Sequence, residues 1–219
     1  MSHNSPKDVG LDYQESFSEK DEHKKVKWGS REGMLNRFKL GIEKVNWSDT
    51  NSWVDVGCGT GSFIDLVLNA SHCQNIVGID VCVDLAEFCR EKFLDDKRVE
   101  ILTGNFETDL IDQKFDLVTS IGVLQNCGLN IDTALTGLVS LLGQGGTIFF
   151  TTKNQNWNKF TSGELTPEDA HLWFDPNIIL EKLRNCGVEV EEIGGFLPRE
   201  NRVVEINDSH TFYILGKLK

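Results

Sequence analysis

The stretch Trp53-Val-Asp-Val-Gly-Cys-Gly-Thr-Gly61 decides the fold. An apolar run typical of a strand leads into three glycines, and a helical pattern begins near Ser62. Glycine allows positive φ angles and lets a ligand lie against bare backbone, while the start of a helix offers unpaired N–H groups. A strand that turns through glycines into a helix therefore predicts a ligand of the nucleotide type at this turn.

Beyond this turn, short apolar runs alternate with helical patterns. The strand-like runs are 53–56, 76–79, 99–102, 115–120 and 147–151, and the helical patterns are 63–68, 85–93 and 131–142. Glycines at positions 143, 145 and 146 are expected to end the last of these helices. The alternation predicts an α/β fold, in which helices cover both faces of a mostly parallel sheet.

The C-terminal third of the chain follows a different pattern. Residues 152–175 form a long connection rich in Asn, Thr and aromatic residues, and a helix is expected to begin at Pro176 and to end at Gly187. Two further strand-like runs, 188–193 and 211–215, have no convincing helical pattern between them. The sequence therefore predicts a final antiparallel pair of strands.

The N-terminal segment is polar and carries only isolated apolar positions. Residues 1–27 are predicted to form a loose arm or a weakly ordered helix. Apolar residues then recur at steps of three and four, which predicts one face of an amphipathic helix formed by Leu35, Phe38, Ile42 and Val45. We therefore divide the chain into a partly flexible arm, residues 1–29, and a single domain, residues 30–219.

Composition and charge exclude several classes of protein. The chain has 219 residues and a net charge of −12, with 39% apolar and 26% charged residues, which is a globular balance. No apolar run approaches the roughly 20 residues that cross a bilayer, and the first 30 residues lack the apolar core of a signal peptide. The six cysteines form no Cys-x-x-Cys pair. We therefore expect a cytoplasmic protein with reduced thiols, no membrane span and no zinc site. An acidic protein repels phosphate backbones, so we expect no nucleic-acid partner.

The glycine turn departs from the dinucleotide-binding fingerprint. That fingerprint requires Gly-x-Gly-x-x-Gly, whereas here the third glycine comes one residue early and Ser62 occupies its place. Asp55, two residues before the first glycine, would repel a pyrophosphate and would suit a ligand that carries an ammonium group. Both departures argue against an NAD-dependent oxidoreductase, which remains the second interpretation.

Two later strand-like runs are followed by residues that suit a nucleoside. Asp80 ends the second run, 19 residues after Gly61, close to the spacing at which an acid binds ribose hydroxyls. Asn105 and Phe106 follow the third run, where an amide could bond an adenine edge and a ring could pack on its face. The alternatives are a turn-forming role for Asn105 and simple core packing for Phe106.

Together these residues resemble the class I S-adenosylmethionine (SAM) dependent methyltransferases. Val54-Asp-Val-Gly-Cys-Gly-Thr-Gly61 matches the first motif of that family, Asp80 matches its ribose-binding acid, and Asn105 falls where the family often has Asp or Asn near adenine. The resemblance spans residues 30–219. It implies a Rossmann-like sheet of seven strands, mostly parallel with an antiparallel last strand. It also implies SAM as cofactor and S-adenosylhomocysteine (SAH) as product. The segment His171-Leu-Trp-Phe-Asp-Pro176 resembles, more loosely, a pattern found in the small-molecule branch of this family, which includes the ubiquinone-biosynthesis type.

The resemblance assigns a set of residues to the cofactor. Trp28-Gly-Ser-Arg with Arg37 resembles an N-terminal helix that covers the cofactor in some relatives, and the alternative for Arg37 is an exposed helix position. The residues expected to contact SAM are Trp28, Arg37, Asp55, Gly57, Cys58, Gly59, Gly61, Asp80, Val81, Asn105, Phe106 and Ile121.

The resemblance also implies in-line transfer of a methyl group to an O, N or C atom of a small-molecule acceptor, without a metal ion. Residues 120–126 do not read Asn-Pro-Pro-Tyr or Asp-Pro-Pro-Tyr, the signature for amide or base nitrogens, so nucleobase and glutamine acceptors rank low. His171 is the candidate catalytic base, and pinning of its loop is the structural alternative. Gln125, Asn126 and Trp173 are the candidate acceptor contacts.

Two further interpretations keep the cofactor and change the outcome. Many relatives in this branch carry a His near position 126, where this chain has Gln125 and Asn126. A catalytically inactive SAM-binding partner subunit is therefore one alternative. Methylation of a protein side chain is the other. The sequence makes no prediction about the oligomeric state.

Overall fold

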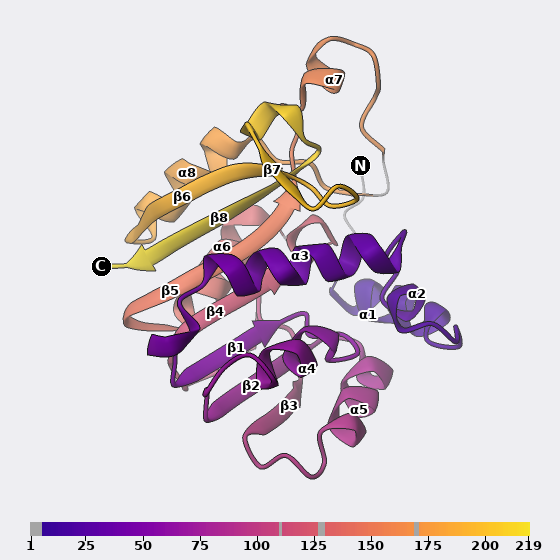
Figure 1. The fold of residues 1–219 in the computed structure, drawn as a ribbon, viewed down its shortest axis with the longest axis vertical. Coiled ribbons are helices and arrows are strands. Elements are labelled where there is room, and N and C mark those ends of the chain that lie inside the picture. Colours follow the sequence, from indigo (N-terminus) through magenta and orange to yellow (C-terminus); the bar gives the residue numbers. More distant parts are fainter. Residues whose placement is uncertain (1–5, 110, 127–129, 169–170) are drawn as a thin grey trace.

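The computed structural model describes residues 6–109, 111–126, 130–168 and 171–219. Its strands form one sheet in the order β3-β2-β1-β4-β5-β8-β6-β7 (Figure 1). The strands are β1 (Ser52–Val56), β2 (Asn75–Asp80), β3 (Val99–Thr103), β4 (Phe115–Ile121), β5 (Leu142–Lys153), β6 (Val188–Leu197), β7 (Arg202–Val204) and β8 (Thr211–Leu218). The α-helices are α1 (Pro6–Ser16), α2 (Glu22–Lys25), α3 (Arg31–Lys44), α4 (Ser62–Leu68), α5 (Val83–Lys92), α6 (Ile131–Ser140), α7 (Asn158–Thr161) and α8 (Pro176–Asn185). Short 3₁₀ turns occupy Trp47–Asp49, Leu124–Asn126 and Ile206–Asp208.

The predicted fold class is confirmed. Strands β1 to β5 pair in parallel, and β8 lies antiparallel between β5 and β6. The predicted antiparallel pair is thus β6 with β8. The sheet of the described residues has eight strands instead of the expected seven, because the three-residue strand β7 pairs with the end of β6. A run of three residues is too short to show the alternation that identifies a strand.

The boundary between α6 and β5 differs from the prediction. Helix α6 ends at Ser140, and Leu142 already pairs with Phe115 in the sheet. The register then shifts, and the next pair joins Leu117 to Thr147. The glycines between them, with a φ of 73° at Gly145, form this irregular start of the strand in addition to ending the helix.

Two apolar cores lie on opposite faces of the sheet. Helices α3, α4 and α5 cover one face, where Phe38, Phe63 and Cys89 join a buried cluster with Trp53. Helices α6 and α8 cover the other face, where residues such as Leu138 are fully buried. Both faces are closed, so the carboxyl ends of the parallel strands provide the accessible crevice, as is usual in such sheets.

The N-terminal arm is helical where it is described, and it lies over these carboxyl ends (Figure 1). Phe17, just after α1, meets Phe88 of α5 edge to face with ring centroids 6.1 Å apart. The Ser16 hydroxyl donates to the carbonyl oxygens of Tyr13 and Lys25, which ties α1 to α2. The predicted arm includes residues 1–5, which lie outside the described residues, and the division at residue 30 stays a prediction.

Candidate active site

The glycine turn after β1 is held against the end of β2. The N–H groups of Gly57 and Cys58 both donate to the carbonyl oxygen of Ile79, at 2.7 and 3.0 Å. Gly59 has a φ of 55°, and a Cβ added there would lie 2.7 Å from Val26 Cγ1. Position 59 therefore requires glycine both for its backbone conformation and for the close approach of the arm.

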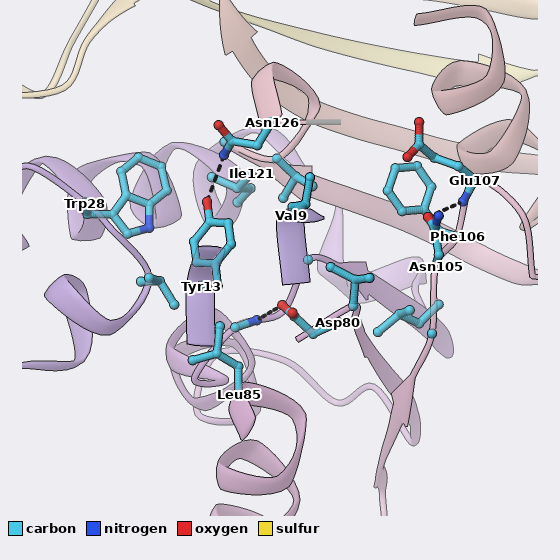
Figure 2. A pocket seen from close by; sticks show the side chains of 18 residues that line it. Val9, Tyr13, Trp28, Asp80, Leu85, Asn105, Phe106, Glu107, Ile121 and Asn126 are labelled. Atoms are coloured by element: carbon cyan, nitrogen blue, oxygen red, sulfur yellow. Dashed lines mark hydrogen bonds between the residues drawn. The ribbon is translucent and has the colours of Figure 1, made fainter. Parts of the chain in front are cut away.

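Asp80 joins this turn to β2 through both of its carboxylate oxygens. The N–H of Gly59 donates to Oδ2 at 2.8 Å (Figure 2), and the N–H of Cys82 donates to Oδ1 at 2.9 Å. Burial raises the pKa of Asp80, and these backbone donors lower it in part. An ionised carboxylate has about four acceptor positions, so two remain for hydroxyl groups of a ligand.

Asp55 lies at the end of β1 in a buried hydrogen-bonded chain. The Thr119 hydroxyl donates to Asp55 Oδ1 at 2.8 Å, and the indole N–H of Trp53 donates to that hydroxyl at 2.8 Å. Burial raises the pKa of Asp55 to about 7, although the Thr119 bond opposes this. No cation forms an ion pair with Asp55 among the described residues. The carboxylate is therefore placed to ionise when a positive group arrives beside it.

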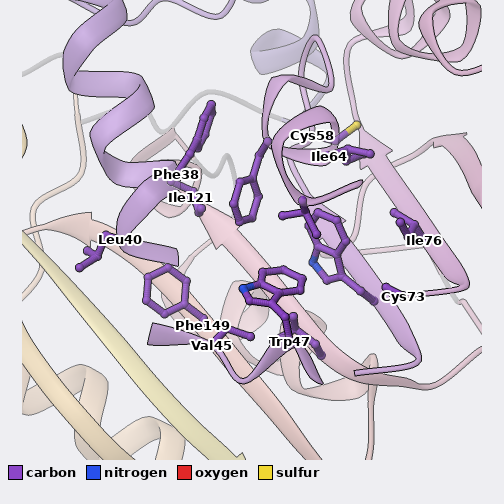
Figure 3. Close-up of a cluster of buried hydrophobic side chains, with 14 of the residues drawn as sticks. Phe38, Leu40, Val45, Trp47, Cys58, Ile64, Cys73, Ile76, Ile121 and Phe149 are labelled. Atoms are coloured by element: carbon purple, nitrogen blue, oxygen red, sulfur yellow. The ribbon is translucent and has the colours of Figure 1, made fainter. Parts of the chain in front are cut away.

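Aromatic packing supports the turn from below. Phe38 of α3 stacks on Phe63 of α4 with centroids 5.2 Å apart, and Trp47 meets Trp53 edge to face at 5.1 Å (Figure 3). Cys58, within the turn, belongs to the same cluster. A hydrogen bond with Cys89 and burial both raise the pKa of its thiol, so the thiol stays neutral. This rigid base fixes the turn relative to the sheet.

A cavity opens between the glycine turn, the ends of β2 to β4, and the arm (Figure 2). Its volume is about 740 Å³ including the open mouth. The residues that line it are Val9, Tyr13, Val26, Trp28, Gly57, Gly59, Ile79, Asp80, Val81, Leu85, Gly104, Asn105, Phe106, Glu107, Ile121, Gly122, Val123 and Asn126. Most of the residues expected to contact the cofactor are thus brought together here.

Asn105 and Phe106 each make the structural contact that was the alternative to ligand binding, and each also lines the cavity. Asn105 Oδ1 accepts the N–H of Glu107 at 3.0 Å, so its side chain bridges the turn after β3 (Figure 2). Asn105 also lines the cavity. Phe106 packs partly into the core beside α6 and also lines the cavity.

The arm covers this cavity and also an adjoining smaller cavity, which shares part of its lining. The smaller cavity, of about 360 Å³, reaches from Val26 and Trp28 past the glycine turn to Asp55. Glu22 of α2 accepts a hydrogen bond from the Ser62 hydroxyl at 2.6 Å, at the start of α4. The arm therefore rests on the same turn that the ligand would contact.

A larger cavity lies on the other side of Trp28 and Gly122, with a volume of about 1910 Å³ including its open mouth. It contains Arg37, which the sequence assigned to the cofactor, so Arg37 lies apart from the first cavity. It also contains Lys153 and His210. Burial lowers the pKa of Lys153 to about 8, and the nearby charge of Arg37 adds to this effect. Burial and then Lys153 lower the pKa of His210 to about 4.

A hydrogen-bonded chain crosses the boundary between the two larger cavities. The Asn126 amide nitrogen donates to the Tyr13 hydroxyl at 2.8 Å, and Asn126 Oδ1 lies 3.2 Å from Nδ1 of His171. This amide orientation makes Nδ1 of His171 the donor and leaves Nε2 with a free lone pair. Burial and then the charge of Lys153 lower the pKa of His171, which favours the neutral ring.

The remaining predicted acceptor contacts lie nearby with different surroundings. Gln125 is buried, its Nε2 donates to the carbonyl oxygen of Gly122 at 2.6 Å, and its Oε1 has no hydrogen-bond partner among the described residues. Trp173 is not among the described residues that line the larger cavity. It lies under Lys153, 5.2 Å from its amine, and against Phe160.

Several cavity residues were missed by the sequence analysis. Val9 and Val26 come from the polar arm, where isolated apolar positions carry no periodic signal. Leu85 comes from a predicted helix, and Lys153 lies two residues beyond the predicted strand 147–151. Nothing in either pattern distinguishes a core or surface residue from one that lines a cavity. The isolated apolar positions at 9, 13 and 26 were the only available hint.

The described residues contain neither a cluster suited to a metal ion nor a helix suited to span a membrane. No three His, Cys, Asp or Glu side chains among residues 6–109, 111–126, 130–168 and 171–219 lie close enough to hold a metal ion. In the same ranges, every helix is too short or too polar to cross a membrane.

Comparison of the sequence with known proteins finds similarity to methyltransferases. Residues 54–148 match the family model described as a methyltransferase domain. Malonyl-[acyl-carrier protein] O-methyltransferase 2 of Ilyobacter polytropus is 27% identical over 147 residues, which cover 67% of this chain and 56% of that protein. The matched segment therefore spans just over half the length of that curated relative.

Solved structures share the fold over nearly the whole chain. The N-methyltransferase NodS of Bradyrhizobium japonicum, in complex with SAH, superposes with a TM-score of 0.67 at 14% identity, and the match covers 96% of this chain and 98% of NodS. The [4+2]-cyclase SpnF superposes with a TM-score of 0.73 at 17% identity, covering 100% and 98% of the two chains. At these identities the likeness establishes the fold.

Proposed function

The chain carries a methyltransferase domain and has the fold of the class I SAM-dependent methyltransferases, and from this premise we propose that it transfers a methyl group from SAM to a small-molecule acceptor. The observation that carries the proposal is the position of Asp80. Its carboxylate is fixed by the glycine turn, faces the cavity and keeps acceptor positions for the two hydroxyls of a ribose.

The shape and charge of the two adjoining cavities suit SAM. The ribose bonds Asp80, the adenine lies between Leu85 and Phe106, and the amide nitrogen of Asn105 reaches a ring nitrogen. The methionine part extends into the smaller cavity, where its ammonium group meets Asp55. A positive sulfonium is also favoured by two acids at this end of the sheet.

The acceptor enters through the larger cavity and meets the methyl group beside Gly122, which lines the first cavity as well. SAM supplies an electrophilic methyl group, and an acceptor lone pair displaces it in line. The protein aligns the two molecules and keeps water out. Trp28 and Tyr13 of the arm line both cavities, so the arm would complete this enclosure.

For an acceptor that must lose a proton, such as a hydroxylated compound, His171 is the residue that would take it; an ionised carboxylate needs no base. The imidazole that relatives of this branch carry near position 126 is replaced here by one from the connection before α8, since His171 is hydrogen-bonded to Asn126. Its neutral ring and free Nε2 suit a general base. This geometry supports turnover and weighs against the inactive-subunit alternative. That alternative is kept because SpnF, named a cyclase, has the same fold.

The name of the curated relative supports an oxygen atom as the one that is methylated. Malonyl thioesters therefore head the list of acceptors to be tried, together with small hydroxylated compounds. Methylation of a protein side chain remains the alternative. A cytoplasmic location is part of the proposal, supported by free thiols at Cys58, Cys73, Cys82, Cys89 and Cys186. Nucleic acid is no part of it, because the net charge is −12.

Calorimetric titration with SAM, SAH and NAD tests the cofactor, and transfer of a labelled methyl group to the acceptor panel tests the reaction. We expect binding of both adenosyl ligands, no binding of NAD, and label in at least one acceptor. Binding without transfer to any acceptor would favour the inactive subunit. Binding of NAD alone would contradict the proposal.

A further inference from the structure

The larger cavity contains two partly buried cations without a counter-ion. Arg37 and Lys153 both line it, and neither forms an ion pair with a carboxylate in the part of the chain that the structure describes. Burying a charge without a partner is costly, so such groups concentrate at binding sites. Two cations without an ion pair in one cavity are unexpected in a chain of net charge −12, because its acidic residues outnumber its basic ones.

Of the other basic groups in this cavity, Lys27 is paired and His210 is neutral, whereas Arg199 is a third cation without an ion pair among the described residues. Lys27 pairs with Asp12 at 2.6 Å. His210 is uncharged near neutral pH, because burial and the charges of Lys153, Arg37 and Arg199 lower its pKa. The acid Glu200 pairs with Arg202 at the rim. Glu168 also lines the cavity and raises the pKa of Lys153, but it forms no ion pair among the described residues. Arg37, Lys153 and Arg199 thus leave the cavity with an excess of positive charge.

Arg37 is held in place and still has donors to offer. Its guanidinium lies over the Trp28 ring, 4.6 Å from the centroid, and Nη1 donates to the carbonyl oxygen of Gly33 at 2.9 Å. Its other hydrogen bond to a described residue is a long one from Nη2 to the Thr211 hydroxyl, at 3.5 Å. A guanidinium has five N–H donors, so an edge remains for an anion.

Neutral donors complete the cavity wall. Thr151 and Thr152 both line the cavity, and their buried hydroxyl groups have no hydrogen-bond partner among the described residues. Successive side chains of a strand point to opposite faces, so the Thr151 hydroxyl is the one on the same side of β5 as Lys153, where it offers an oxyanion an additional donor.

The site is divided by charge. Asp55 and Asp80 lie on the side of Trp28 where the cationic cofactor would bind, and Arg37 and Lys153 lie on the other side. We propose that the acceptor carries an anionic oxygen group, a carboxylate or a phosphate, which Arg37 and Lys153 bind together in the larger cavity. This inference rests on the proposed function, since it places the acceptor's reactive atom at Gly122, beside the methyl group.

The test is anion binding to the SAH-loaded protein. Malonate, succinate and inorganic phosphate are titrated at constant ionic strength, with malonamide as the uncharged counterpart of malonate. We expect the wild-type protein to bind at least one anion and not malonamide. The dicarboxylate and phosphate arms then decide which anionic group the cavity takes. Absence of binding by all three anions would overturn the proposal.

Matched variants assign the binding to the two cations. In Arg37→Met and in Lys153→Met we expect anion affinity to fall about tenfold or more, as for loss of a charged hydrogen-bond partner. Lys153→Arg should retain most of the affinity, and Lys97→Met, an exposed lysine before β3 at the opposite edge of the sheet, should leave it unchanged. Because an unpaired cation is removed, Lys153→Met should melt no lower than the wild type.

Two outcomes separate this proposal from the proposed function. If SAH affinity fell in step with anion affinity in Arg37→Met and Lys153→Met, the cations would serve the cofactor and the acceptor assignment would be wrong. If SAH failed to bind the wild-type protein, the proposed function would fail. The anion titrations on the ligand-free protein would still report on the two cations.

Discussion

The N–H of Gly59 donates to Oδ2 of Asp80 across 2.8 Å, and this bond joins the glycine turn to the end of the neighbouring strand. A turn after β1 and an acid after β2 are thereby fixed relative to each other before any ligand binds. The fold itself therefore sets the distance between the carboxylate proposed to bind the ribose and the backbone of the glycine turn.

Asp80→Ala should weaken SAH binding by at least tenfold and also destabilise the ligand-free protein. The ribose hydroxyls lose their acceptor, and the N–H groups of Gly59 and Cys82 are left unpaired, at about 1–3 kcal/mol for each buried group. Calorimetry and thermal unfolding measure the two effects. Asp95→Ala, at an exposed position after α5, is the control. Unchanged SAH affinity would remove Asp80 from the cofactor site.

Gly59→Val should abolish SAH binding, because a side chain there requires a positive φ and meets Val26. The strained backbone costs about 1–3 kcal/mol, which a protein of this size tolerates. Gly59→Ala combined with Val26→Ala removes the steric conflict and keeps the backbone strain. If the double variant bound SAH as the wild type does, the conformation of the turn would not matter for binding.

The free energy of unfolding should depend on pH through Asp55. The folded state keeps this proton up to about pH 7, whereas the unfolded chain releases it near its ordinary pKa of about 3.9. The contribution to stability is therefore fully present below about pH 4 and is lost as the pH rises to 7. Asp55→Asn should flatten this part of the profile and raise the melting temperature at pH 8. A profile as steep as the wild type's would point to another group.

SAM affinity should show the opposite dependence. Only the ionised form of Asp55 attracts the ammonium group, so SAM should bind more tightly as the pH rises through about 7. Calorimetry at pH 6 and pH 8 checks this, with Asp55→Asn as the reference in which the increase disappears. An equal increase in both proteins would place the titrating group elsewhere.

Anion binding in the larger cavity should weaken as the pH rises above about 8, because Lys153 then loses its proton. The groups around it are Arg37 from α3, Glu168 and His171 from the connection before α8, and His210 and Arg199 near the start of β8 and the end of β6. Of these, Arg37 lowers the pKa of Lys153 and Glu168 raises it. Malonate titrations from pH 7 to 9 measure the effect, which Lys153→Arg should shift out of this range. An unaltered profile in that variant would exclude Lys153.

With a hydroxylated acceptor, His171→Gln should lower kcat by about 10²–10⁴, the usual contribution of a general base, and should leave SAM affinity unchanged. Asn126→Ala should have a smaller effect and change the pH profile of kcat, because Asn126 only orients the ring. An unchanged kcat in His171→Gln with that acceptor would exclude His171 as the base.

The sequence predicted those parts of the fold that depend on local patterns. Alternating apolar runs identified β1 to β4 within a residue or two, and the glycine motif located the turn. The short strand β7 and the early start of β5 were missed, because three residues carry no period and because glycines that end a helix can also lie in an irregular strand.

The cofactor side of the site was largely predictable, whereas the acceptor side was not. Asp80 follows from its distance to the glycines along the chain. Lys153, Thr151 and Thr152 lie at the end of one strand and meet Arg37 and His171 only through the folded arrangement. Contacts between segments more than a hundred residues apart leave no spacing to detect, which explains why the sequence could not place Arg37 in the larger cavity beyond Trp28.

The arm that roofs the cofactor cavity also has a consequence for the speed of repeated turnover. Glu22 bonds Ser62, and Val26 lies against Gly59, so a nucleoside product in the cavity is enclosed by these contacts. SAH can then leave only as fast as they break, and its residence time would be set by a segment that takes no part in the chemistry. Product inhibition and the steady-state rate would accordingly be properties of residues 9–28 as much as of the catalytic groups.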